Sequence, residues 1–352
     1  MLKFLLRRAL AVPITFLVIT AVLYGIIMLS PAETRAQLYF PPRTRPFMPQ
    51  HIYENTLNRI IEEHHLDDPY PVQYLHWLSC LLRGEWGWSP VVDDDVLDAL
   101  LARTPATAEL TLYSLLLMVP LGLASGVAAA RKRGRLIDRG FRMAAYVATS
   151  IPPFILGLVL LSLFYVGVHW FPPGRLDFST SLDARSFRTF TGLLTVDGLL
   201  NGRPDISTEA LRHLALPVIT LSLTHWATLG RVMRVTMIEE LDKDYVVAAR
   251  ARGLSPRSIT WRHVFLNAVP PALTSTALSA ASLITGVFVV EAVFAFPGVS
   301  KLIVRTMGLT PDAPMAMGFA VYCVLAVLLL MLLLDIVQAL VNPWLREEVN
   351  EK

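Results

Sequence analysis

Long apolar runs alternate with polar stretches along the whole chain. The first run, over about 9–29, has roughly the 20 residues that a helix needs to cross a bilayer. Five more membrane helices are predicted by the runs over about 108–130, 143–168, 214–235, 270–290 and 315–340. A cleaved signal peptide is the alternative for the first run, because Lys3, Arg7 and Arg8 precede it. The run is longer than the usual apolar core of a signal peptide, which favours a retained helix.

The polar stretches predict which side of the membrane each connection occupies. Residues 131–142 hold six basic side chains against one acidic side chain, which indicates a cytoplasmic loop. Both termini are then cytoplasmic as well. The connections 31–105, 169–212 and 300–314 lie outside, and the first of them contains apolar residues at helical spacing near 52–61 and 71–82.

The predicted fold class is an all-α integral membrane protein with six transmembrane helices. A helical extracytoplasmic insertion separates the first two of these helices. The predicted parts are 1–30 with the first span, 31–105 with the insertion, and 106–352 with the core domain and the other five spans.

Composition fits this prediction and excludes other classes. The chain is 54% hydrophobic and 17% charged, which is too apolar for an ordinary soluble domain. Its net charge of +3 is small, so nucleic-acid binding is not indicated. Cys80 lies in an external stretch and Cys323 in a membrane run, so we predict no disulfide. In Glu62–His65 the adjacent histidines would point about 100° apart on a helix, which disfavours a metal site there.

Two features inside the membrane runs are candidates for a translocation pathway. Pro152 and Pro153 remove backbone hydrogen bonds, which predicts a bend in the third span. A polar group in the fourth span and a face of small residues in the fifth span would suit a water-filled pathway. The candidate lining residues are Thr224, His225, Trp226, Ser279, Ser282 and Gly286. Helix packing without a role in transport is the alternative.

A charged segment, 244–268, lies between two apolar runs and predicts two short helices joined by a turn. Gly253 can adopt the left-handed conformation that ends many helices. Ser255 is a favourable N-cap, and Pro256 suits the first position of the second helix. The small side chains of Ala248, Ala249 and Ala251, ringed by arginines, suit docking into a partner's groove. A basic cytoplasmic loop that serves topology alone is the alternative.

This segment, part of a loop at about 236–268, resembles the coupling loop of ABC-transporter permeases of the dipeptide, oligopeptide and nickel import family. The matching residues are Asp244-Tyr245, Ala249-Arg250-Ala251, Arg252-Gly253-Leu254, Arg262-His263 and Asn267-Ala268. Leu66–Leu75, Glu291–Gly298 and Asn342-Pro343 are similar to further patterns of the family. One departure is Val247, which stands where the general import-permease motif has a glutamate.

The resemblance implies the fold of a type I ABC importer permease, embedded in the lipid of the inner membrane. The residues implied in coupling to an ATPase are Asp244, Tyr245, Ala248, Ala249, Arg250, Arg252, Gly253, Leu254, Ser255, Pro256, Arg262 and His263. The implied partners are a homologous second permease, two ATP-binding subunits and an extracytoplasmic substrate-binding protein. ATP and magnesium would be bound by the ATPase subunits, so we expect no cofactor, metal or catalytic residue in this chain.

Three other functions have little support in the sequence. The chain lacks a Gly-x-x-x-x-Gly-Lys-Ser/Thr phosphate loop and is therefore not itself the ATPase. Ionisable residues are sparse at mid-membrane depth, which disfavours a stand-alone secondary carrier. Common hydrolase motifs are absent, which disfavours a membrane-embedded enzyme. The resemblance instead implies a transport subunit for di- or oligopeptides, with nickel complexes and short oligosaccharides as alternative cargoes.

Overall fold

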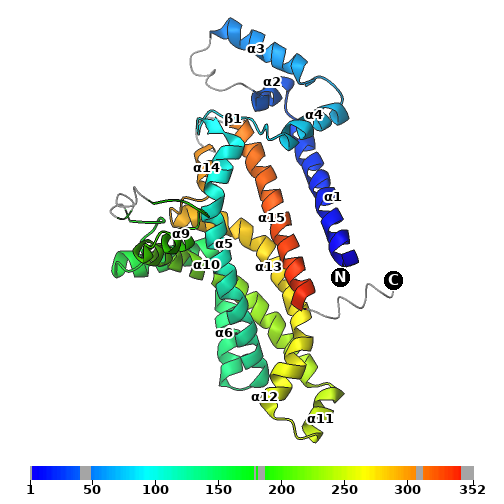
Figure 1. Ribbon diagram of the computed structural model, residues 1–352, viewed down its shortest axis with the longest axis vertical. Coiled ribbons are helices and arrows are strands. Elements are labelled where there is room, and N and C mark those ends of the chain that lie inside the picture. Colours follow the sequence, from blue (N-terminus) through cyan, green and yellow to red (C-terminus); the bar gives the residue numbers. More distant parts are fainter. Residues whose placement is uncertain (1, 40–48, 178–179, 181–186, 307–311, 342–352) are drawn as a thin grey trace. The chain divides into compact units, whose positions relative to one another are not determined.

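The computed structural model describes residues 2–39, 49–177, 180, 187–306 and 312–341, and this described part is almost entirely helical (Figure 1). The chain divides into two compact units. The core unit is built around Ala106–Pro297, and the insertion unit combines Leu6–Pro105 with Gly298–Leu329. The family-like Asn342-Pro343 pair lies outside the described residues.

The core unit centres on α10 (Pro204–Leu241), a helix of 38 residues that packs along α13 (Phe265–Val293). Leu221, Val287 and Phe294 belong to the buried cluster that these helices share. The other elements are the later part of α5 (Val96–Arg131), α6 (Leu136–Ser150), α7 (Pro153–Leu161), η2 (Ser162–Gly167), α9 (Leu194–Leu200), α11 (Asp244–Ala251), α12 (Pro256–Ser258) and η4 (Ile259–Val264). Because α6, α7 and α9 all contact α10, this helix is the centre of the unit (Figure 1).

The third predicted span is broken rather than gently bent. α6 and the α7–η2 segment meet at an angle of 99°. Pro152 disfavours helical conformation in the residue before it, and Ile151 accordingly has extended angles of φ −96° and ψ 121°. The predicted bend at Pro152 and Pro153 is confirmed, but it is sharp enough to break the run into two helices, because paired prolines indicate a bend without giving its angle.

Close contact between α5 and α10 depends on Gly126. A β-carbon added at Gly126 would lie 2.7 Å from the carbonyl oxygen of Gly230 and 2.8 Å from the β-carbon of Met233. Neither atom can move away by a side-chain rotation alone. The two helices therefore approach each other through small residues, as helices in membranes commonly do.

We expect Gly126→Ala to destabilise the protein by about 1–3 kcal/mol, the usual effect of overfilling a packed contact. The melting temperature of the purified protein in detergent measures this loss. Gly140→Ala is the matched control, because a β-carbon at Gly140 of α6 would meet nothing within 4 Å. The control should be neutral or slightly stabilising, since alanine favours a helix over glycine. Equal melting temperatures for the two variants would contradict the predicted contact.

The insertion unit contains the predicted helical insertion. Its elements are most of α1 (Leu2–Ile27), α2 (Ala32–Arg35), η1 (Ala36–Tyr39), α3 (Gln50–Glu63), α4 (Tyr70–Leu82), β1 (Trp88–Ser89), β2 (Asp94–Asp95), α14 (Ser300–Thr306) and the first part of α15 (Ala313–Val341). The helices expected near 52–61 and 71–82 are confirmed as α3 and α4. Strands β1 and β2 pair antiparallel, with Trp88 opposite Asp95. The prediction of a purely α-helical chain was wrong at this short ribbon.

An aromatic cluster and one buried amide hold the insertion unit together. Tyr24 of α1 is fully buried, with its ring centroid 5.2 Å from that of Trp77 in α4. Gln73, only 1% exposed, accepts a hydrogen bond from Arg35 at 2.6 Å. Its amide nitrogen donates to the carbonyl of Leu66, also at 2.6 Å. These contacts join α1, α2 and α4 into one packed unit.

Among the described residues, three helices are long and apolar enough to cross a membrane, at Leu10–Ile27, Val96–Arg131 and Ala313–Ile336. The bent pair of α6 and α7–η2 makes a fourth candidate if it counts as one span. These four correspond to the first, second, sixth and third predicted runs. The remaining two runs, 214–235 and 270–290, lie within α10 and α13. Cys80 and Cys323 are both free, which confirms the prediction of no disulfide between them.

Candidate functional site

The turn at the end of α11 has the hydrogen bonds of a Schellman motif. The N–H of Gly253 donates to the carbonyl of Arg250 at 2.9 Å, and the N–H of Leu254 donates to the carbonyl of Ala249 at 3.2 Å. Gly253 has a φ of +78°, a conformation that strains residues with a β-carbon. The predicted bend at Gly253 is confirmed.

The second short helix begins two residues later. The hydroxyl of Ser255 accepts a hydrogen bond from the N–H of Ser258 at 3.3 Å, and Pro256 occupies the first helical turn. Both predicted roles are confirmed. α12 then runs directly into η4 and α13 without a break. The bend at Gly253 therefore leads by continuous helical backbone into a long helix of the core unit.

The inner side of α11 and η4 is fixed to α10 by apolar packing. Val246 and Ile259 are buried in one cluster with Met233 and Met237 of α10. Ala249 belongs to the same cluster and is only 8% exposed. The predicted docking surface of three alanines was therefore wrong for Ala249, because this residue lies on the inward face of its helix.

Tyr245 ties the start of α11 to the end of α10. Its hydroxyl donates to one carboxylate oxygen of Glu240 at 2.8 Å, while the ammonium group of Lys243 donates to the other oxygen at 2.6 Å. Burial raises the pKa of Tyr245, so this hydroxyl keeps the proton that it donates. The contacts at Glu240 and the apolar packing together give α11 a fixed orientation on the core unit.

The outer side of the segment combines apolar side chains with positive charge. Val247 and Leu254 are 61% and 39% exposed. The other predicted coupling residues on the exposed side are Asp244, Ala248, Arg250, Arg252, Gly253, Ser255, Pro256, Arg262 and His263. A cavity of about 420 Å³ beside Leu254 is lined in part by Arg131 and Arg133. Apolar residues surrounded by arginines fit a protein interface with a dry centre and a charged rim.

A buried ion pair joins α6 to α10. Asp138 is 1% exposed and accepts two hydrogen bonds from the guanidinium of Arg234, at 2.5 and 2.9 Å. The N–H of Gly134 donates to the same carboxylate at 2.9 Å. Such a bidentate arginine–carboxylate contact fixes the relative orientation of the two side chains as well as their distance. Sequence analysis used Asp138 only as the acidic residue of a basic loop and missed this contact.

A second buried carboxylate joins α5 to the connection between η2 and α10. Glu109 is fully buried, and its Oε1 accepts from the N–H and the hydroxyl of Thr195 at 2.8 and 2.7 Å. Its Oε2 accepts from Arg175 at 2.7 Å, and the same Arg175 nitrogen donates to the carbonyl of Gly192 at 2.6 Å. This network fixes two separate parts of the connection onto α5.

Comparison with known proteins identifies the fold to which these features belong. A family described as binding-protein-dependent transport system inner membrane component matches residues 119–347. The N-terminal part of such membrane components matches residues 1–111. The chain belongs to this permease family.

Several curated relatives match the permease along most of its length. The di/tripeptide transport system permease protein DppB of Pseudomonas aeruginosa is 33% identical over 350 residues, covering 99% of this chain and 100% of the relative. The oligopeptide transport system permease protein AppB of Bacillus subtilis is 30% identical, and the alignment covers 97% of this chain and 99% of the relative. The probable D,D-dipeptide transport system permease protein DdpB of Escherichia coli is 36% identical, and the alignment covers 79% of this chain and 81% of the relative.

A solved structure supports the same fold. A chain of the MetNI methionine ABC transporter, in an inward-facing conformation, aligns with a TM-score of 0.50 at 17% identity. The alignment covers 70% of the permease and 97% of that chain. The permease is thus an inner membrane component and a transport subunit rather than an enzyme. Membership of a binding-protein-dependent ABC system implies ATPase and binding-protein partners.

In the permease, the polar group predicted to line a pathway lies within the contacts of α10. The indole nitrogen of Trp226 donates to the hydroxyl of Ser125 in α5 at 2.9 Å. Its ring also meets the edge of Phe141 in α6, with centroids 5.7 Å apart. Thr224 and His225 are partly buried beside it. The contacts of Trp226 favour a packing role, and lining of a pathway stays a prediction for Thr224 and His225.

The small-residue face of α13 likewise takes part in packing. A β-carbon at Gly286 would lie 3.4 Å from a terminal methyl group of Leu221, so α10 passes close to this point. The hydroxyl of Ser282 donates to the carbonyl of Ser279 at 2.9 Å and is thereby turned along its own helix. A pathway role for Ser279, Ser282 and Gly286 stays a prediction.

His64 and His65 follow the end of α3, and the rings of both lie near His76 of α4, with centroids 5.1 and 6.3 Å from it. His64 Nδ1 lies 2.9 Å from Nε2 of His76, and burial lowers the pKa of His64. His65 has a φ of +55° and also pairs with Asp68 at 3.0 Å, so the helical spacing from which divergence was expected does not apply here. His76 is the partner that sequence analysis missed, because it belongs to the next helix.

Proposed function

We propose that the permease forms, together with a homologous second permease, the translocation pathway of an ATP-driven importer. Two ATPase subunits supply the energy, and an extracytoplasmic binding protein delivers the cargo. In this proposal α10 and α13 also cross the membrane, in addition to the three long apolar helices and the bent α6–α7 pair. The chain then has six spans, and both termini are cytoplasmic. The parts of the chain are 1–30, the extracytoplasmic region 31–105 and the core permease domain 106–352.

The observation that carries the proposal is the geometry of the 244–264 segment. Its inner side is packed onto α10, and its outer side presents Val247 and Leu254 among exposed arginines. Exposed apolar side chains beside arginines on a short, firmly held helix favour a docking surface over a connecting loop. The segment therefore supports the implied role as the contact with the ATPase. ATP and magnesium belong to that partner.

The proposed mechanism is alternating access. Closure of the ATPases on ATP moves the docked α11–α12 segment, and the movement passes through η4 into α13 and through the apolar cluster into α10. Because these helices share a packed core, they shift as rigid elements between two arrangements. The outward-open arrangement receives cargo from the binding protein.

The proposed cargo is di- or oligopeptides. The support is the function of the relatives, which include a di/tripeptide, a probable D,D-dipeptide and an oligopeptide permease. The family resemblance leaves nickel complexes and short oligosaccharides as the alternatives.

Reconstitution tests the proposed function. The permease is co-expressed with the second permease and the ATPase encoded beside it, purified as a complex and placed in proteoliposomes with the binding protein. We expect uptake of a labelled dipeptide only when ATP is supplied on the ATPase side, with unlabelled peptides competing. Uptake by the permease alone, driven by an ion gradient without ATP, would show a secondary carrier instead.

A further inference from the structure

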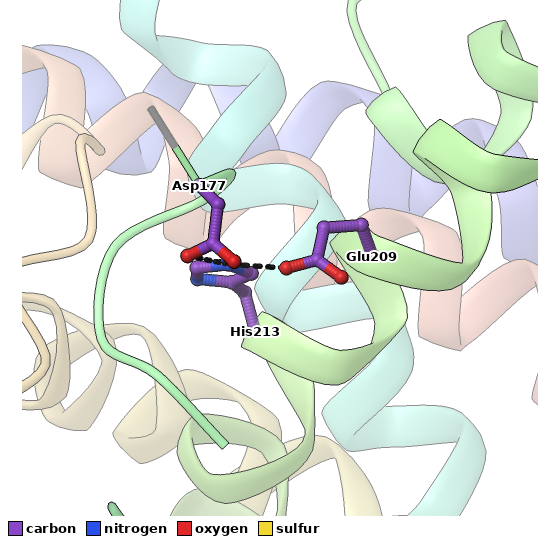
Figure 2. Close-up of side chains that lie close together, drawn as sticks. All are labelled: Asp177, Glu209 and His213. Carbon is purple, nitrogen blue, oxygen red and sulfur yellow. Dashed lines mark hydrogen bonds and ion pairs between the residues drawn. The ribbon is translucent and has the colours of Figure 1, made fainter. Parts of the chain in front are cut away.

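Three side chains outside the coupling segment converge on one point at the start of α10. Glu209 and His213 project from successive turns of α10, and Asp177 reaches the same point from the preceding loop (Figure 2). Their ligand atoms all lie within 4.8 Å of one another. His213 is 1% exposed, Glu209 is 18% exposed and Asp177 is 47% exposed, so the cluster is closed on the helix side and open on the loop side.

Against the expectation of no metal that followed from the family resemblance, we propose that Asp177, Glu209 and His213 bind a divalent transition-metal cation of the zinc class. Histidine nitrogen and carboxylate oxygen are both zinc ligands, and an open zinc site has three protein ligands with a water molecule in the fourth position. Calcium and magnesium prefer oxygen ligands alone, so the histidine favours zinc and its neighbours in softness over them. The cation would be a resident part of the permease and not its cargo.

The spacing of the ligand atoms fits this coordination. Nε2 of His213 lies 3.2 Å from Oε1 of Glu209 and 3.5 Å from Oδ1 of Asp177. Ligand atoms of a tetrahedral zinc at about 2.0 Å are separated by about 3.3 Å from one another. These two separations lie on either side of that value, and the third, between the two carboxylates, is at most 4.8 Å, so a zinc ion would draw the Asp177 and Glu209 oxygens together.

The hydrogen bond of the other ring nitrogen prepares His213 to bind a metal. Nδ1 of His213 lies 3.1 Å from the carbonyl oxygen of Pro173. A carbonyl oxygen only accepts, so this contact holds a proton on Nδ1, while Nε2 lies within hydrogen-bond distance of the Glu209 carboxylate. In the neutral ring with its proton on Nδ1, the lone pair of Nε2 faces two carboxylate oxygens, and a cation between these three atoms removes their mutual repulsion. Nδ1–H bonded to a backbone carbonyl is the usual support of a metal-binding histidine.

Among the described residues, Arg212 is a cation that approaches both carboxylates of this cluster. Its Nε and Nη2 donate to the carbonyls of Trp170 and His169 at 2.5 and 3.1 Å. Only Nη1 faces the carboxylates, at 3.4 Å from Glu209 and 3.9 Å from Asp177. Two carboxylates and one guanidinium leave a net charge of −1 beside the imidazole, which attracts a divalent cation.

Metal content tests the proposal on the full permease, purified within its complex through a tag that contains no histidine. The complex is stripped with a chelator, reloaded with zinc chloride and desalted. We expect the wild-type complex to hold about one more zinc per permease than a complex assembled with the Glu209→Gln variant. The zinc affinity of that variant should be lower by at least about tenfold. His213→Gln should behave alike. The matched controls Asp205→Asn and His169→Gln alter exposed residues nearby and should keep the metal.

X-ray absorption at the zinc edge identifies the ligands independently of folding. We expect only nitrogen and oxygen neighbours at about 2.0–2.1 Å. A sulfur neighbour at about 2.3 Å would place the metal at a cysteine such as Cys80 and overturn the proposal. Equal zinc content and affinity in wild type, Glu209→Gln and His213→Gln would overturn it as well. So would failure of the wild type to bind zinc, since the three groups would then form only a protonated ion-pair cluster.

Discussion

Gly253→Ile is expected to separate ATP hydrolysis from uptake in the reconstituted complex. The φ of +78° at this position strains any residue with a β-carbon, and a β-branched side chain most of all. Relief of the strain straightens or unwinds the turn that orients α11 against α12. A penalty of about 1–2 kcal/mol corresponds to a factor of roughly 5–30 in a conformational equilibrium. We therefore expect peptide uptake to fall by about tenfold while the complex still hydrolyses ATP.

The chain offers a matched control for this experiment. Gly202 has a φ of +67°, and a β-carbon would meet nothing within 4 Å at either Gly202 or Gly253. Gly202→Ile therefore introduces the same kind of backbone strain in a turn outside the coupling segment. It should leave the ratio of uptake to hydrolysis unchanged, and Gly253→Asn should recover much of the loss because asparagine tolerates this conformation. Equal uncoupling by both isoleucine variants would refute a special role of Gly253.

Local signals explain why the coupling segment could be predicted from sequence. Gly253, Ser255 and Pro256 act through the hydrogen bonds of their immediate neighbours, so their residue types alone indicate the turn and the cap. The side of α11 that faces the core depends instead on its packing against Met233 and Met237 of α10. The exposed and buried alanines of the segment were therefore indistinguishable in the sequence.

Long-range pairs explain what the sequence did not reveal. Asp138 and Arg234 are 96 residues apart, and Glu109 and Arg175 are 66 residues apart. No local pattern connects such partners, so neither buried pair is indicated by the residues around it. Hydropathy also marks the apolar part of a helix rather than its ends, which is why α10 runs over 204–241 where an apolar run of 214–235 was predicted.

The buried network around Glu109 predicts the largest effect on stability. Arg175→Ala should lower the free energy of unfolding by about 3–5 kcal/mol, because removing one partner leaves the buried carboxylate of Glu109 uncompensated. The same change also removes the hydrogen bond to Gly192. Detergent-solubilised permease titrated with a denaturing detergent gives the unfolding free energy. The control is Arg203→Ala, because Arg203 pairs at 2.7 Å with Asp205 at the surface. Exposed ion pairs contribute only about 0–1 kcal/mol.

The double variant decides whether the lost charge compensation causes this effect. Glu109→Gln in the Arg175→Ala background removes the uncompensated charge while keeping an acceptor for Thr195. If the buried charge dominates, the double variant should be more stable than Arg175→Ala alone. In the double-mutant cycle of these two substitutions, the coupling energy between Glu109 and Arg175 should exceed about 1 kcal/mol. Additive losses would mean that Arg175 acts through its packing and its bond to Gly192, and that the Glu109 carboxylate is compensated by the Thr195 donors alone.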